Sequence, residues 1–92
     1  MQLYAPSIIV PGQPIIASFE AEQRVSGRLR LTLDTEAIEF TLEREGRDPV
    51  RSNGPRLRGK QASFAISDWG EHRSGTELVL RFEGAKVWLT VA

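Results

Sequence analysis

The chain has 92 residues, which is enough for one domain, residues 1–92, with a single hydrophobic core. It contains no cysteine, so disulfide bonds, thiolate zinc sites and thiol catalysis are excluded. Twelve Lys and Arg balance twelve Asp and Glu, and this zero net charge argues against a generic binder of nucleic acid or of membrane surfaces.

Apolar and polar residues alternate with a period of two along most of the chain; Leu29 and Leu31, for example, alternate with Arg28 and Arg30. This pattern is typical of a strand with one face in a core and the other in water. The seven segments that show it are, in chain order, residues 7–10, 14–22, 27–34, 37–45, 61–67, 76–83 and 86–91. No segment carries the 3.6-residue apolar stripe of an amphipathic helix. The sequence therefore predicts an all-β fold, and Arg56–Arg58 adds a candidate short edge strand.

Turn signals separate these segments. Pro11-Gly12 stands between the first two, and residues 34–36 join the third and fourth closely enough for a hairpin. Gly84-Ala85 joins the last two in the same way. About seven short strands with frequent turns predict an antiparallel β-sandwich.

The two ends of the chain resemble those of immunoglobulin-like domains. "APSIIVPGQPIIASFEA" (residues 5–21) is similar to their opening, and "GTELVLRFEGAKVWLTVA" (residues 75–92) is similar to their last hairpin. The resemblance implies an immunoglobulin-like antiparallel β-sandwich of about seven strands, and it implies no particular partner. The chain departs from that family in having no cysteine pair and in having Leu31 where the third strand usually carries a tryptophan.

Residues 44–60 hold six of the twelve basic side chains against only two acids. The predicted anion-binding residues of this run are Arg47, Arg51, Arg56, Arg58 and Lys60. The run contains no aromatic residue, although nucleic-acid modules usually interleave aromatic and basic residues. Three interpretations stay open: a solvated loop with a charged, aggregation-resistant edge, a contact with an acidic protein surface (another copy of this chain included), and a site for nucleic acid or another polyanion.

Trp88 is the candidate for an exposed aromatic contact. Strict alternation directs it outward on the last strand, and Val79 and Arg81 share the outward face of the neighbouring strand. An apolar pair within a charged rim is typical of a modest interface, so Val79, Arg81 and Trp88 are the predicted protein-binding residues. The alternatives are a minor apolar cluster without a partner, and carbohydrate binding by Trp88 together with Trp69, which requires both rings on one surface.

No segment predicts catalysis, a metal site or a cofactor. Asp68 and His72 lie in one loop, whereas a catalytic relay needs its members on separate elements, and one histidine with two carboxylates is a weak ligand set. Residues 34–37 resemble the Asp-Thr-Gly-Ala motif of retroviral-type aspartic proteases, but Glu36 stands where that family needs glycine. No apolar run approaches the ~20 residues of a membrane span. We expect a non-catalytic structural or protein-binding module that associates with a protein partner or with itself, without a membrane partner.

Overall fold

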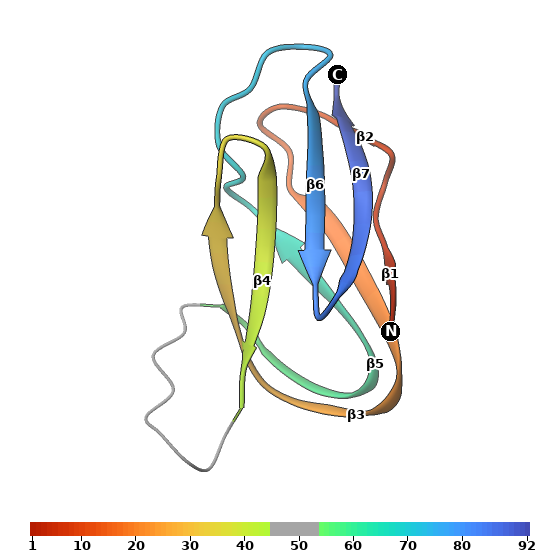
Figure 1. The fold of residues 1–92 in the computed structure, drawn as a ribbon. Helices are drawn as coiled ribbons and strands as arrows, with labels where there is room; N and C mark the ends of the chain where they lie inside the picture. Colours follow the sequence, from red (N-terminus) through yellow and green to blue (C-terminus); the bar gives the residue numbers. More distant parts are fainter. Residues whose placement is uncertain (45–53) are drawn as a thin grey trace.

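The structure, a computed structural model, describes residues 1–44 and 54–92 and is all-β over these residues (Figure 1). None of the described segments is a helix of the length and apolarity that a membrane span requires. The strands are β1 (Gln2–Tyr4), β2 (Ile8–Ile9), β3 (Ile15–Leu33), β4 (Ala37–Glu43), β5 (Arg56–Ile66), β6 (Glu77–Phe82) and β7 (Ala85–Val91).

The strands form one mixed sheet in the order β1-β3-β4-β6-β7-β2, with β5 paired to β3 outside this path. Strand β3 joins the two halves of the sheet. Its first part pairs with β1 and β5, and its last residues pair with β4. The sheet therefore folds over along β3, so that the first part of β3 and β5 lie behind β4, β6 and β7, and β1 lies at the side next to β7 (Figure 1).

Two pairings correct the expectation of an antiparallel sheet. Strands β4 and β6 run parallel, and so do β2 and β7. The chain leaves β4, runs through β5 in the other half of the sheet, and returns in β6. Because two reversals of direction separate β4 from β6, the two strands point the same way. Alternation of apolar residues reports which face is buried and carries no information on strand direction.

The predicted segments 14–22 and 27–34 are one continuous strand, β3, and residues 56–58 and 61–67 likewise merge into β5. The pairing of β3 with β5 is irregular between Glu20 and Val25, where the sheet bends. Gly27 then approaches β4 so closely that an added Cβ would lie 2.3 Å from the carbonyl oxygen of Glu43. Only glycine fits there, which is why the sheet can fold at this point.

Aromatic contacts hold the two halves together. The rings of Phe19 and Phe64, from the rear half, lie 5.4 and 6.2 Å from that of Phe82 in β6, and Phe64 lies 4.8 Å from Phe40 in β4. All four are buried, with the predicted inward leucines Leu78, Leu80 and Leu89. The prediction of the inward faces of β4, β6 and β7 is confirmed. Leu33, in contrast, is 44% exposed near the tip of the β3–β4 hairpin.

Candidate functional site

The outer face of β4, β6 and β7 carries an apolar row that crosses the three strands. Register pairing places Ala37 of β4 beside Val79 of β6, and Val79 beside Trp88 of β7. Their neighbours Leu78, Leu80 and Leu89 point into the core. The row is thus separated from the core by the sheet itself, and it belongs to a surface of the molecule.

The members of this row differ sharply in exposure. Trp88 is 62% exposed, whereas Val79 is 6% exposed although it lies outside the main core cluster. The predicted outward direction of Trp88 is confirmed. Val79 also lies on the outer face, but its side chain is covered by the surrounding residues. It forms the floor of the site and contributes little surface of its own.

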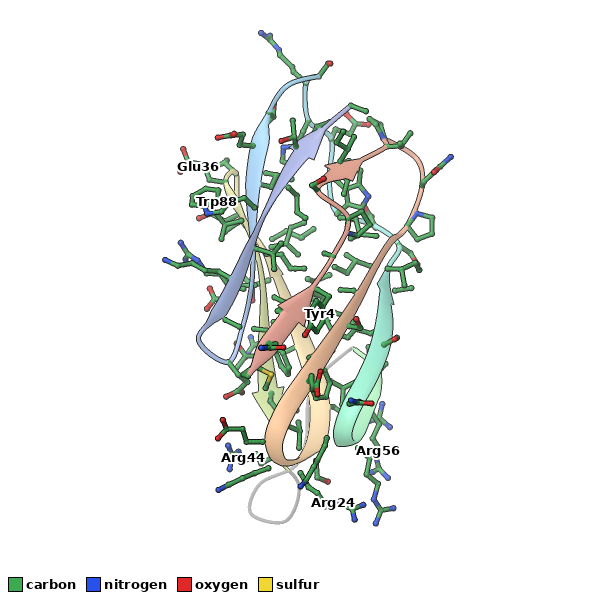
Figure 2. The ribbon with its side chains drawn as sticks, turned by 90° about the vertical axis from the view of Figure 1, so that its right-hand side faces the viewer. Tyr4, Arg24, Glu36, Arg44, Arg56 and Trp88 are labelled. Atoms are coloured by element: carbon green, nitrogen blue, oxygen red, sulfur yellow. The ribbon has the colours of Figure 1, made fainter. Side chains whose placement is uncertain are left out.

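A groove of about 580 Å³ runs over this row. Trp88, Val79 and Ala37 supply its apolar lining, and its charged lining consists of Asp34, Glu36, Glu77 and Arg81. Figure 2 shows Glu36 and Trp88 close together in the upper part of the molecule. The groove therefore combines an exposed indole ring with a mostly acidic rim. The sequence pointed to Trp88, Val79 and Arg81, and alternation also placed Glu77 on their outward face. It gave no signal for Glu36, because Glu36 is brought to this face only by the parallel pairing of β4 with β6.

The acidic rim is fixed by the backbone of the β3–β4 turn. The Asp34 N–H donates to the Ala37 carbonyl at 2.8 Å, and the Asp34 Oδ1 accepts from the Thr35 N–H at 2.6 Å. The Glu36 carbonyl accepts a hydrogen bond from the Val79 N–H at 2.9 Å, which attaches the turn to β6. These bonds hold the turn in place while the Glu36 side chain extends into solvent.

Trp69 does not share a surface with Trp88. It is 4% exposed and belongs to the main core, and its indole N–H donates to the Gln13 carbonyl at 2.9 Å. Its ring stacks on His72 at 5.9 Å. The expectation of a platform built from both tryptophans is wrong, because the loop after β5 folds Trp69 inward to close one end of the core. Apolar and polar residues do not alternate around Trp69, so the sequence did not predict that its side chain is buried.

The predicted anion-binding residues fall into two groups. Arg47 and Arg51 lie outside the described residues. Arg56, Arg58 and Lys60 lie on β5 and are exposed, and Arg56 and Arg58 flank the buried Leu57 and so share one face of the strand. This part of the basic run is strand and not loop.

A second hollow, of about 450 Å³, lies at the same end of the molecule as Arg56 (Figure 2). Arg24 and Arg44 line it, together with Glu83. Its apolar lining includes Val25 and Leu42. Twenty positions separate the two arginines, and the fold of the sheet at Gly27 brings them together. Because only this fold of the sheet places Arg24 beside Arg44, the sequence did not identify Arg24 as part of a basic surface.

The polar residues of the loop after β5 have local contacts. The Asp68 Oδ1 accepts a hydrogen bond from the Gly70 N–H at 3.3 Å, and the His72 Nε2 lies 3.2 Å from the Trp69 carbonyl oxygen. Among residues 1–44 and 54–92, no group of three or more His, Asp or Glu side chains is placed to hold a metal ion. Comparisons with protein-family models, with curated proteins and with solved structures found no match for this chain. The groove and the charge distribution are therefore the features from which a function is inferred.

Proposed function

We propose that this protein is a non-catalytic protein-binding module and that the groove around Trp88 is its contact surface. The observation that carries the proposal is the 62% exposure of an indole ring on a regular strand, directly beside the floor residue Val79. Exposed tryptophan is uncommon on protein surfaces and is enriched among the residues that dominate binding energy at interfaces. The ring is carried by a hydrogen-bonded hairpin, so a partner would not have to order the backbone at this position on binding.

The chemistry of the rim defines the kind of partner. Asp34, Glu36 and Glu77 place three carboxylates around the indole, and Arg81 is the one guanidinium in the same lining. A partner segment with basic side chains beside an apolar anchor would complement this surface. Cationic side chains also stack favourably on the face of an indole ring.

We also infer that the architecture is an immunoglobulin-like β-sandwich. The support is the two facing halves of the sheet, the last antiparallel hairpin β6–β7, and a first segment that pairs with β3 and then with β7. Such sandwiches present their outer sheet faces and end loops to partners. The parallel β4–β6 pairing would be a departure from the usual topology.

A peptide-display selection on the immobilised chain tests the function. We expect basic peptides with an aromatic or aliphatic anchor to be enriched, and we expect Trp88→Ala to abolish their binding. The matched control is Ile16→Ala, which removes another exposed apolar side chain (55% exposed) from β3, in the rear half of the sheet, and should leave binding unchanged. Selected peptides that bind wild type and Trp88→Ala equally would overturn the proposal.

Polyanion binding is a second candidate, favoured by the exposed basic residues Arg56, Arg58 and Lys60 of β5 with Arg28 opposite Arg56. A row of exposed basic side chains along a strand can contact a phosphate backbone. Binding to single- or double-stranded nucleic acid should weaken steeply between about 50 and 200 mM salt and should be lost in an Arg58→Gln/Lys60→Gln variant. Absence of binding at low salt would reject it.

A further inference from the structure

We propose that the chain associates with itself head to tail, the acidic hairpin tip and Trp88 groove of one copy docking against the basic end of the next. This inference rests on the proposed function, because it assigns a partner to the groove. It goes further in naming that partner as a second copy and in defining the surface that the second copy presents.

The acidic surface projects from the fold. The β3–β4 turn forms a hairpin tip with the carboxylates of Asp34 and Glu36, and Leu33 beside them is 44% exposed. Glu77, at the start of β6, adds a third carboxylate to the groove that this tip borders. The tip therefore offers an apolar side chain and acidic groups together.

The opposite end is basic and hollow. The basic residues there are Arg24, Arg28, Arg44, Arg56, Arg58 and Lys60, and the acids there are Glu20, Glu22, Glu43 and Glu83. Figure 2 shows Arg24, Arg44 and Arg56 at this end, far from Glu36 and Trp88. The hollow of about 450 Å³ opens here, with Arg24 and Arg44 in its lining and Val25 and Leu42 as apolar contacts.

The two surfaces match in charge and in chemistry. Carboxylates at the tip would face the guanidinium groups of Arg24 and Arg44, and Leu33 would face Val25 and Leu42 in the hollow. Each copy carries both surfaces on different parts of the molecule, so the contact is heterologous and one copy can bind a neighbour at each end. Opposite potentials of this kind raise the association rate and fix the orientation of docking.

The expected strength is low. A hairpin tip in a small hollow buries less surface than the roughly 800 Å² per partner of a standard interface, so the association is weak and transient. Because exposed charges supply much of the attraction, it weakens as salt shortens the Debye length. Sedimentation velocity or light scattering over about 20 μM to 1 mM protein, at low and high salt, is the appropriate measurement.

Two double variants of the full chain test the arrangement. Arg24→Glu/Arg44→Glu reverses the charge of the basic end, and Glu36→Arg/Glu77→Arg reverses that of the acidic surface. Asp34 is retained because its carboxylate accepts the Thr35 N–H in the turn. Wild type should gain mass at about 20 mM salt, and each variant alone should lose association by about tenfold or more.

The decisive sample is a 1:1 mixture of the two variants. The first keeps an intact acidic surface and the second an intact basic end, and their two reversed surfaces are also complementary to each other in charge. The mixture should therefore regain the association that each variant alone has lost. A variant reversed at both ends should regain self-association. A monomeric wild type at low salt, or a mixture that stays monomeric, would overturn the proposal.

The control is Arg73→Glu/Lys86→Glu, which changes the net charge as much as the first variant does but lies outside the lining of the hollow. It should associate as wild type does, and loss of association here would show a net-charge effect and overturn the docking arrangement. Should a reversed variant fail to fold by circular dichroism, the glutamine variants at the same positions replace it. A monomeric chain that still binds peptides through Trp88 would refute this inference and leave the proposed function standing, whereas loss of both would refute both.

Discussion

Trp88 and Val79 lie directly opposite each other on the paired strands β7 and β6, yet one is 62% exposed and the other 6%. Opposing residues on one face of an antiparallel pair have Cβ atoms about 5 Å apart, so the indole ring is a principal cover of the valine. The exposed ring therefore has a structural role on the outer face as well as the proposed binding role. The two roles predict different consequences of substitution.

Trp88→Ala should lower the free energy of unfolding by only about 0.5–1 kcal/mol, because it removes one cross-strand contact and leaves the main core intact. Leu80→Ala, at a fully buried position of the adjacent strand, should cost about 2–5 kcal/mol. Urea denaturation measures both values. A Trp88→Ala cost as large as that of Leu80→Ala would mean that the ring is part of the core, and it would weaken the case for a contact surface.

Trp69→Phe should destabilise the protein by about 1–3 kcal/mol, since it removes the hydrogen bond to the Gln13 carbonyl and part of the ring that closes the core. The matched control is Trp88→Phe, which should change the stability by less than about 0.5 kcal/mol. Fluorescence checks the burial independently. The Trp88→Phe variant retains only the buried indole, so its emission should be blue-shifted and poorly quenched by acrylamide, and strong quenching would contradict the burial of Trp69.

The period-two pattern correctly predicted which faces of β4, β6 and β7 are buried, because a strand with one face in the core carries apolar residues at alternate positions. It did not predict the parallel pairing of β4 with β6, since alternation is the same in either direction. It also divided β3 into two strands at residues 23–26, whereas β3 is continuous there and pairs with β5 on both sides of a register shift. Strand existence was therefore more predictable than strand connection.

The candidate site was predictable only where one strand defines it. Trp88 points outward by alternation alone, and its exposure followed from the sequence. The acidic rim depends on the parallel pairing of β4 with β6, and the hollow with Arg24 depends on the fold of the sheet at Gly27. The burial of Trp69 could not be predicted either, because it lies in a loop and is buried by tertiary packing that no local sequence pattern indicates.

Glu83→Asn should stabilise the protein by a few tenths to about 1 kcal/mol. The β6–β7 turn consists of Glu83 and Gly84, one residue earlier than expected, and both have positive φ angles, 48° and 82°. Asparagine adopts this conformation more readily than glutamate, and Asn-Gly is the preferred pair in such two-residue turns. Thermal or urea unfolding measures the gain. Glu83→Gln is the control, since it removes the same charge without changing the backbone preference, and an equal gain from it would assign the effect to charge.

Gly27→Ala should lower the free energy of unfolding by about 3 kcal/mol or more. The residue has a φ of +153°, and a Cβ there would lie 2.3 Å from the Glu43 carbonyl oxygen, so strain and a backbone clash add together. Gly12→Ala is the matched control: its φ of +83° is also unfavourable for alanine, but nothing lies within 4 Å of the added atom. That variant should cost only about 1 kcal/mol. Urea denaturation of the pair separates clash from conformational strain, and equal losses would mean that the close approach of β3 to β4 at Gly27 does not determine how the sheet folds.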